Sequence, residues 1–118
     1  MIHVRTLFVP YKLVLAEKRP VTLEVTLKNR GAEEKLVSVA LTCAKALSLN
    51  PGGFAKHMEK RIGKIKPGTS ALVTFKIYAK PTTLPGEYPL ELSVIEHAGE
   101  SYDYVEREKR YPLKLRVV

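Results

Sequence analysis

The sequence predicts an all-β fold, an antiparallel β-sandwich of about seven strands in one domain over residues 1–118. Four segments alternate apolar and polar residues, at positions 21–28, 37–43, 73–79 and 88–94. A period of two puts successive side chains on opposite faces of a strand, with one face buried and the other in water. The junctions around these segments carry Asn-x-Gly or Pro-Gly, and no convincing helix lies between them. Strands joined by tight turns are typical of two packed antiparallel sheets.

The N-terminal half is expected to supply the first strands. Residues 4–16 are strand-like but interrupted by Pro10, which cannot donate a hydrogen bond to a sheet. We therefore expect this segment at an edge, breaking at the proline and passing from one sheet to the other. The strand at 21–28 ends in an Asn-x-Gly turn, in which Gly31 is expected to take a positive φ. The next strand is expected over 35–46, with four residues facing the core: Val37, Val39, Leu41 and Cys43.

The middle of the chain is less regular. Residues 50–53, Asn-Pro-Gly-Gly, indicate a loop, and residues 55–60 are expected to make a short helical turn. A short strand is expected at 61–65. Lys-Pro-Gly-Thr at 66–69 then matches a type II turn, which favours proline at its second position and glycine at its third. The strand at 71–79 is expected to turn three residues inward: Val73, Phe75 and Ile77.

The most specific local signal is the segment Leu-Pro-Gly-Glu-Tyr at 84–88. It joins two strands by a Pro-Gly turn and places Tyr88 at the start of the second strand. In immunoglobulin-like sandwiches a tyrosine at this place turns back, and its hydroxyl bonds the backbone upstream. The alternative is that Tyr88 is an ordinary inward-facing aromatic residue. Spacing and turn type favour the tyrosine corner, and with it an immunoglobulin-like sandwich, whose last strand is expected at 111–118 after a long charged hairpin at 98–110.

Composition indicates the broad class of the protein. A chain of 118 residues, 45% of them hydrophobic, is long enough to bury a core without disulfides. No apolar run approaches the roughly 20 residues of a membrane helix. The first residues lack the apolar core of a secretory signal, and the single cysteine, Cys43, lies on the buried register of its strand, so we expect a cytoplasmic protein. The absence of Gln, the two Asn residues and the eight prolines suggest a thermophile.

Several segments resemble CARDB-type domains, which are small immunoglobulin-like modules of archaeal and bacterial proteins. Residues 21–31 resemble the second strand and Asn-x-Gly turn of these domains. Residues 62–69, followed by 73–75, are similar to their mid-domain Pro-Gly turn, and residues 84–92 to their late strand pair. The resemblance covers about residues 15–118. It implies the sandwich fold, and it transfers no catalytic residue because the family carries none.

No residue pattern in the sequence supports catalysis, a cofactor or a metal. The three histidines, His3, His57 and His97, lie in separate segments, whereas metal sites need clustered ligands. The glycine pair at 52–53 follows a proline and opens no helix, so it does not match a phosphate-binding loop. The twelve acidic residues are scattered. We therefore expect no enzyme activity, no cofactor and no metal site.

The net charge of +8 raises the hypothesis of a nucleic-acid partner. Basic residues with interleaved aromatic residues are what a single-strand binder uses for phosphates and base stacking. The alternative is a lysine-rich solvated surface, because charge alone also serves solubility. Nucleic-acid binding is therefore the second hypothesis for this chain. Its candidate residues are Lys56, Lys60, Arg61, Lys64 and Lys66.

The favoured hypothesis is a non-catalytic module that binds a protein partner. An exposed strand edge offers a row of unpaired N–H and C=O groups, and tyrosine and arginine tend to anchor interfaces. The expected contact surface is the edge of the last strand together with the hairpin at 98–110. The same edge pairing with its copy across a two-fold axis would give a homodimer. The candidate partner-binding residues are Tyr102, Tyr104, Arg107, Arg110 and Tyr111.

Overall fold

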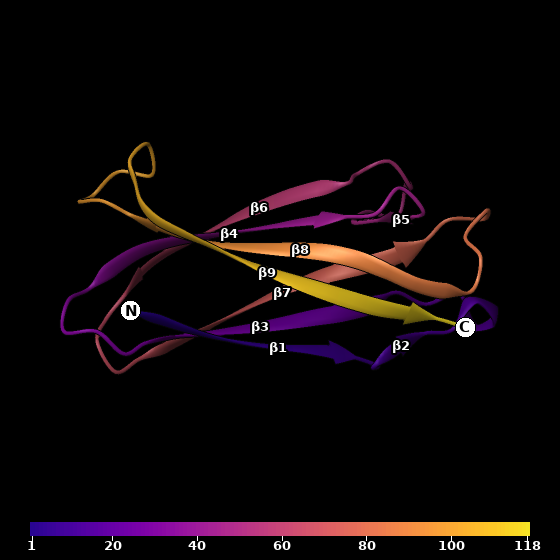
Figure 1. The fold of residues 1–118 in the computed structure, drawn as a ribbon, viewed down its shortest axis with the longest axis horizontal. Coiled ribbons are helices and arrows are strands. Elements are labelled where there is room, and N and C mark those ends of the chain that lie inside the picture. Colours follow the sequence, from indigo (N-terminus) through magenta and orange to yellow (C-terminus); the bar gives the residue numbers. More distant parts are fainter.

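Two sheets packed face to face make up the molecule, which a computed structural model describes over residues 1–118 (Figure 1). The prediction of an all-β sandwich is confirmed. Seven strands have eight or more residues, two further strands have two residues each, and a single 3-10 turn, η1 (Leu15–Glu17), is the only helical element. No helix has the length and apolar character that crossing a membrane requires.

The two sheets differ in size but share an antiparallel design. The four-stranded sheet has the order β1 (Ile2–Val9), β3 (Val21–Asn29), β7 (Ser70–Ala79), β5 (Leu47–Ser48). The five-stranded sheet has the order β2 (Lys12–Leu13), β9 (Val105–Val117), β8 (Gly86–His97), β4 (Lys35–Cys43), β6 (His57–Ile65). All pairs are antiparallel except β2 with β9, which is parallel. The chain therefore changes sheet between β1 and β2, at Pro10, as the sequence predicts.

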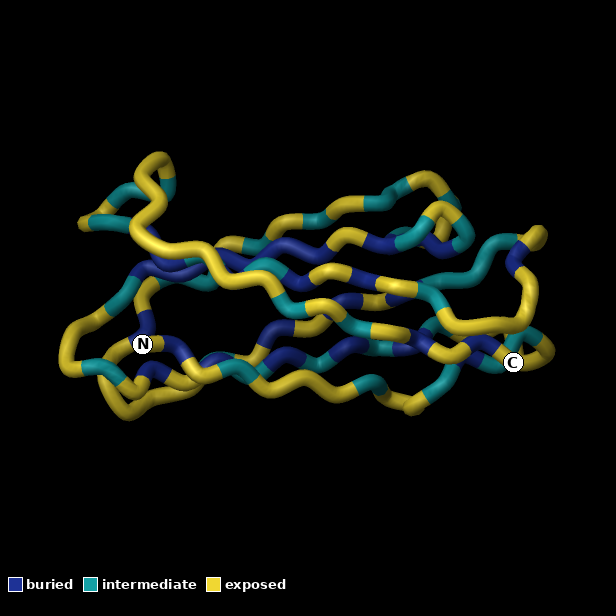
Figure 2. Tube along the Cα trace, in the orientation of Figure 1, coloured by how far each residue is buried: buried dark blue, intermediate teal, exposed yellow.

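The core lies between the sheets and contains the residues that the alternation predicts. Figure 2 shows buried and exposed positions alternating along the strands. The inward side chains of β3 are almost completely shielded from water, and those of β4, β7 and β8 meet them. Burying a side chain of this size stabilises the fold by roughly 1.5–3 kcal/mol. The buried residues include Leu23, Val25, Val39, Leu41, Phe75, Ile77, Leu92 and Cys43.

Two predicted turns have the geometry that their residues indicate. Gly68 has a φ of 77°, and the N–H of Thr69 donates to the carbonyl of Lys66 at 3.1 Å. A type II turn requires such a glycine because a side chain would clash at positive φ. The Tyr88 hydroxyl donates to the carbonyl of Leu84 at 2.6 Å. The tyrosine-corner interpretation is therefore confirmed over that of an ordinary aromatic residue.

Four local predictions are wrong, and three concern strand limits. Residues 55–60 make no helical turn: β6 begins at His57, because pairing with β4 along its whole length outweighs weak local helix propensity. The strand β4 ends at Cys43 rather than 46, and β9 begins at Val105, six residues before the predicted 111. The extra length of β9 comes from its pairing with β8, which a charged sequence does not reveal.

The fourth wrong prediction concerns Gly31, which does not take a positive φ. A β carbon built at Gly31 would lie 2.7 Å from the backbone nitrogen of Met1. The glycine is therefore needed for close approach between the β3–β4 connection and the start of β1, rather than for backbone freedom.

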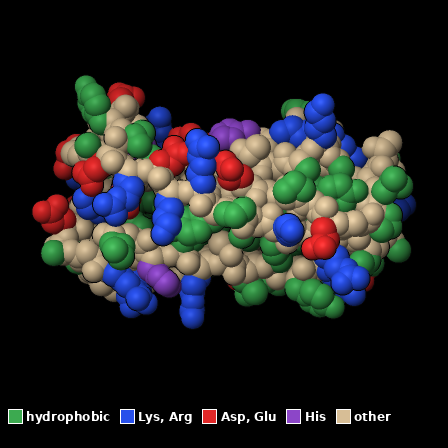
Figure 3. All heavy atoms as spheres, viewed as in Figure 1, with side chains coloured by type: hydrophobic (Ala, Val, Ile, Leu, Met, Phe, Trp, Pro, Cys, Tyr) green, Lys and Arg blue, Asp and Glu red, His purple; other side chains and the backbone are tan.

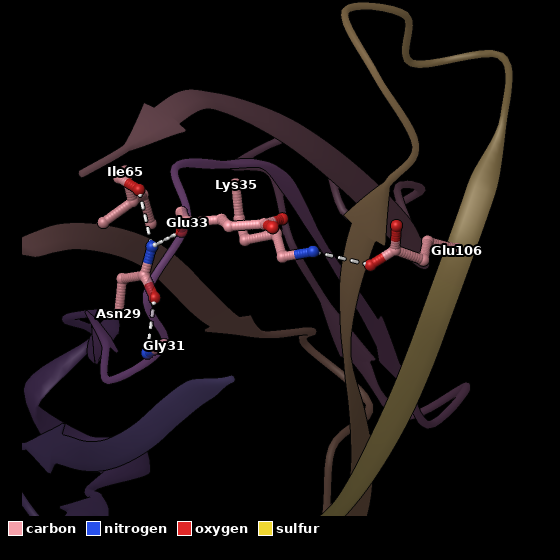
Figure 4. Close-up of polar contacts among 6 residues, drawn as sticks. All are labelled: Asn29, Gly31, Glu33, Lys35, Ile65 and Glu106. Carbon is pink, nitrogen blue, oxygen red and sulfur yellow. Dashed lines mark hydrogen bonds and ion pairs between the residues drawn. The ribbon is translucent and has the colours of Figure 1, made fainter. Parts of the chain in front are cut away.

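Asn29, the last residue of β3, joins the two sheets at this end of the molecule (Figure 4). Its side chain is fully buried. The Nδ2 group donates to the carbonyls of Glu33 at 2.7 Å and Ile65 at 2.8 Å, while Oδ1 accepts from the N–H of Gly31 at 2.9 Å. Since Ile65 belongs to the opposite sheet, one amide side chain holds the β3–β4 connection and the end of β6 together.

Candidate interaction surface at the open side of the sandwich

One long side of the sandwich is open, between β1 of the four-stranded sheet and β9 of the five-stranded sheet. A groove of about 320 Å³ lies there. Residues 1–4 line it from one side, and residues of β8 and β9 from the other. On the opposite long side, Lys60 of β6 donates to the carbonyl of Thr74 in β7 and so bridges the two sheets. The open side therefore presents two strand edges with a groove between them.

The β1 edge is a continuous row of unpaired backbone groups. The N–H of Arg30 donates to the carbonyl of Met1 at 2.8 Å, which places the backbone groups of odd-numbered residues toward β3. Alternation then turns the N–H and C=O of even-numbered residues away from the sheet. The strand pairs with β3 without a bulge and contains no proline, lysine or acidic residue. The residues whose N–H and C=O groups point away from β3 are Ile2, Val4, Thr6 and Phe8.

The β9 edge is better protected. Val118 exchanges backbone hydrogen bonds of 2.9 Å with Leu13 and Leu15, so even-numbered residues at this end turn away from β8. Along that edge, Pro112 lacks the N–H that a further strand would need. Charged residues lie on both sides of Pro112 in β9. Proline and charge are the usual means of preventing edge-to-edge pairing, so β1 is the more available edge.

The five predicted partner-binding residues do not form one patch. Tyr102 packs edge-on against His97 at 5.0 Å between ring centroids, and the Arg61 guanidinium lies 4.7 Å from its ring. Tyr104 is 68% exposed at the base of the hairpin loop, where its carbonyl accepts from the N–H of Ala98 at 2.9 Å. Arg107 and Tyr111 line the groove, whereas Arg110 lies on the outer face of β9. There its Nε is 2.8 Å from Glu108 and 3.9 Å from Glu91. The hairpin loop projects above the five-stranded sheet (Figure 1).

The five predicted nucleic-acid residues are largely engaged within the chain. The Lys60 ammonium, besides its bond to Thr74, lies 4.9 Å from the Phe75 ring centroid. Lys56 donates to the carbonyl of Leu47 at 2.9 Å. Lys64 pairs with Glu100 at 2.5 Å, and that hydrogen bond raises the pKa of Lys64 above its ordinary value.

The Arg61 guanidinium lies over the Tyr102 ring, so Lys66 is the one residue of the five whose side chain makes no hydrogen bond, ion pair or aromatic contact. On the face drawn in Figure 3, basic side chains stand in separate groups with acidic ones between them. No continuous basic stripe is seen on that face. The predicted nucleic-acid residues also contact the hairpin loop that carries the predicted partner-binding residues. Arg61 lies over the Tyr102 ring, and Lys64 pairs with Glu100.

Three buried polar side chains lie near the open side or the hairpin: Ser38, Glu96 and His97. Ser38 and His97 are both buried, and Ser38 Oγ lies 2.7 Å from His97 Nε2. His97 Nδ1 is buried without a partner, so no third group orients this pair as nucleophilic catalysis requires. Glu96 is buried beside the groove and stands opposite Arg107 in the β8–β9 register. No three residues among His, Cys, Asp and Glu come together as metal ligands would.

Sequence reasoning missed groove residues contributed by β1, by the end of β8 and by the middle of β9. These are Ile2, His3, Val4, Glu96 and Lys109. One signal was present: residues 2–9 form an apolar, proline-free strand at the chain start, the kind of edge that proteins usually protect. The position of β1 beside β9 depends on the order of the strands in the two sheets, and local sequence patterns do not predict that order.

These features define an all-β, immunoglobulin-like sandwich with one open side. No family model matches the chain, and no curated protein matches it in sequence. Its fold is similar to that of solved structures. Native alpha-2-macroglobulin from Escherichia coli, in a crystal structure from domain MG7 to the C-terminus, matches 100% of this chain with a TM-score of 0.69 and 16% identity. The chain spans 16% of that structure's length.

Two further structures match as nearly whole chains. A FixG-related protein from Vibrio parahaemolyticus has a TM-score of 0.61 and 9% identity, with 98% of this chain and 95% of that chain covered. AvmM, described as catalysing macrocyclization in alchivemycin A biosynthesis, has a TM-score of 0.56 and 8% identity, with 98% and 88% covered. At such identities the likeness shows the fold alone, and one fold hosts different roles.

Proposed function

We propose that this chain is a non-catalytic protein-binding or accessory module that takes up an extended, acidic segment of a partner as an added strand on β1. The observation that carries this proposal is the free β1 edge, with no proline, bulge or lysine, beside a groove lined by basic residues. Strand addition uses the main chain for affinity and side-chain pockets for specificity. The likeness to a domain within alpha-2-macroglobulin is compatible with an accessory role.

Charge favours an acidic partner over a second copy of the chain. His3, Arg107 and Lys109 line the groove, with Glu96 as the single acid, and Arg5 stands on the outer face of β1. The whole chain carries a net charge of +8, so two copies repel each other while an acidic segment is attracted. The alternative is that a second copy of the chain pairs with β1 to form a homodimer. Sedimentation at two salt concentrations would detect such a dimer.

The test uses a synthetic peptide of alternating valine and glutamate as the probe, followed by amide hydrogen exchange and NMR. Strand addition should protect the N–H groups of Val4, Thr6 and Phe8, which are unpaired in the free chain, and leave the exchange of Arg5 and Leu7 almost unchanged. A peptide of alternating valine and lysine should bind at least tenfold more weakly, because it meets a basic groove.

Variants at Thr6 separate strand addition from other modes of binding. Thr6→Pro removes an outward N–H, so it should abolish protection by the acidic peptide. Thr6→Val keeps the N–H and serves as the matched control, with binding close to the original. If Thr6→Pro remains folded and binds the peptide as well as Thr6→Val, the β1 edge is not the site.

Nucleic-acid binding remains the second candidate, and the net charge of +8 supports it. Phosphate contacts release counterions, so affinity would fall steeply and linearly with the logarithm of salt concentration. The measurement is binding to single- and double-stranded DNA and RNA across a salt series. Micromolar affinity at physiological salt, lost in a Lys60, Arg61 and Lys64 triple alanine variant, would place nucleic acid first.

We further propose that this chain is a CARDB-like module, that it comes from a thermophile and that it works in the cytoplasm. The strand and turn segments at 21–31 and 62–69 support the family resemblance. Sparse amide side chains and proline-rich connections suit high temperature. The single cysteine, Cys43, is free and buried, which suits a reducing compartment.

A further inference from the structure

A second surface feature lies at the end of the sandwich where the C-terminus is found (Figure 1). It is a cleft of about 590 Å³ between the segment 13–19, which contains η1, and the segment 78–83, which comprises the last two residues of β7 and the loop that follows. Val14, Leu15 and Ala79 contribute apolar surface, together with Tyr78. This volume lies within the range of small-molecule sites.

Hydrogen bonds hold both walls of the cleft. The N–H of Leu15 donates to the carbonyl of Val118 at 2.9 Å, which fixes the η1 wall to the end of β9. Thr83 is buried in the other wall, where its Oγ1 accepts from the N–H of Lys80 at 2.8 Å and donates to the carbonyl of Ala46 at 2.5 Å. The cleft is therefore formed before any ligand arrives, which reduces the entropy lost on binding.

The polar lining of the cleft carries one sign of charge. Lys18, Arg19 and Lys80 line it, and no acidic residue does. Glu17 is the nearest acid in the η1 segment; it is 3.4 Å from Arg19, and both side chains are half or more exposed. The neighbouring Lys80 ammonium lowers the pKa of Lys56, because two positive charges close together repel each other. Arg19 thus has one exposed ion-pair partner, whereas Lys18 and Lys80 make no ion pair within the chain.

Lys18 itself occupies an unfavourable backbone conformation. Its φ is 53° and its ψ is 35°, the left-handed region, and it is the only residue other than glycine with a positive φ. Glycine would adopt this conformation without steric cost. Strained positions of this kind cluster at ligand sites, where the side chain serves a purpose that glycine cannot.

We infer that this cleft binds a small amphiphilic anion, a carboxylate attached to an apolar chain of medium length. The carboxylate would pair with the rim formed by Lys18, Arg19 and Lys80, and the apolar chain of the ligand would cover the exposed surface of Val14 and Leu15. This site is separate from the β1 edge, so its success or failure says nothing about strand addition there.

The experiment is an NMR titration of the labelled protein with decanoate below its micellar concentration. Saturable shifts should be confined to amides around the cleft, such as those of Leu15, Ala79 and Thr83. Decanol, which has the same chain without the charge, should bind at least tenfold more weakly, and acetate should give no saturable shift. Equal binding of decanol and decanoate, or shifts spread over the whole molecule, would overturn the assignment.

Three single variants test the cationic rim. Lys80→Ala and Lys18→Gly should each weaken decanoate binding about threefold, the effect of one partly exposed ion pair. Lys66→Ala removes an equal charge from the remote β6–β7 turn and should leave the affinity unchanged. Lys18→Gly should also raise the unfolding temperature, since glycine relieves the strain, so weaker binding by a more stable protein cannot be attributed to misfolding. An equal loss in Lys66→Ala, or no loss in either rim variant, would show that the cleft does not select the anion.

Discussion

At the scale of single residues, the fold depends on a few polar side chains with defined geometry. Asn29 donates two hydrogen bonds and accepts one while fully buried. Buried amides are tolerated only when their groups are satisfied, and here the partners belong to segments far apart in the chain. The sequence marks Asn29 only as part of a turn. Its role between the sheets becomes visible when Ile65 is placed beside it.

We expect Asn29→Asp to destabilise the protein by about 3 kcal/mol. A carboxylate of the same shape cannot donate to the carbonyls of Glu33 and Ile65, and it brings a buried charge to two acceptor oxygens. Urea unfolding at pH 7 measures the change. Asn50→Asp is the control for an Asn-to-Asp change and should cost much less, because the Asn50 side chain is half-buried and uses its Oδ1 as an acceptor, which a carboxylate retains. Equal losses at both positions would contradict the role of Asn29.

The tyrosine corner gives a second residue-scale prediction. Tyr88→Phe should destabilise by about 1 kcal/mol, because it removes the hydroxyl bond to Leu84 and keeps the ring. Tyr88→Ala should cost about 3–5 kcal/mol, since it also removes an aromatic side chain packed against the core. Denaturant midpoints distinguish the two losses. A Phe variant as stable as the original protein would mean that the bond makes no net contribution.

At the scale of elements, an ion pair connects two strands that are not neighbours in their sheet. Lys35 of β4 donates to Glu106 at the start of β9 at 2.7 Å, across β8 (Figure 4). This hydrogen bond raises the pKa of Lys35 above 10.5 and lowers the pKa of Glu106 below 4.5. The Lys35 side chain is largely shielded, so salt should screen the pair less than a fully exposed one.

The pH dependence of this pair follows from those directions. Because the folded pKa of Glu106 is lowered, its contribution is present above about pH 4.5 and lost as the pH falls through the folded value. Because the folded pKa of Lys35 is raised, its contribution is present below pH 10.5 and lost above the folded value. Glu106→Gln should therefore lower the unfolding midpoint slightly at pH 7, and the difference should vanish near pH 2. A difference that persists at pH 2 would contradict the assignment.

At the scale of the whole molecule, the chain is an elongated sandwich of 46 × 24 × 19 Å with one bridged side and one open side. Lys60 joins the sheets on the bridged side, and the groove beside β1 separates them on the other. This asymmetry supports the proposal that a partner strand adds to the β1 edge. The cleft near the C-terminus is a second, independent surface.

Thermal unfolding tests the thermophile proposal at this scale. We expect a single cooperative transition above about 70 °C, beyond the range typical of domains from mesophiles. The expectation rests on sparse amides and prolines in the connections. Differential scanning calorimetry measures it. A midpoint within the mesophile range of about 45–65 °C would remove the support for a thermophile origin.

The sequence by itself determined the strand faces, the Pro-Gly turns and the tyrosine corner. These features are local: a period of two needs only one strand, and the corner spans the five residues from Leu84 to Tyr88. The same local information predicted the break at Pro10 and the burial of Cys43. It misjudged residues 55–60, where pairing with β4 prolongs a strand that local preference does not support.

Only the tertiary structure decided which surfaces exist. Tyr102 and Arg61 are 41 positions apart, yet they stack, and this contact joins a residue of one predicted binding set to a residue of the other. An extra residue in β6, between Arg61 and Gly63, shifts the register against β4 and thereby sets which basic side chains face outward. Edges and grooves depend on which strands become neighbours, and that choice is made by pairing between distant segments. The free edge of β1 and its position beside β9 are consequences of that pairing.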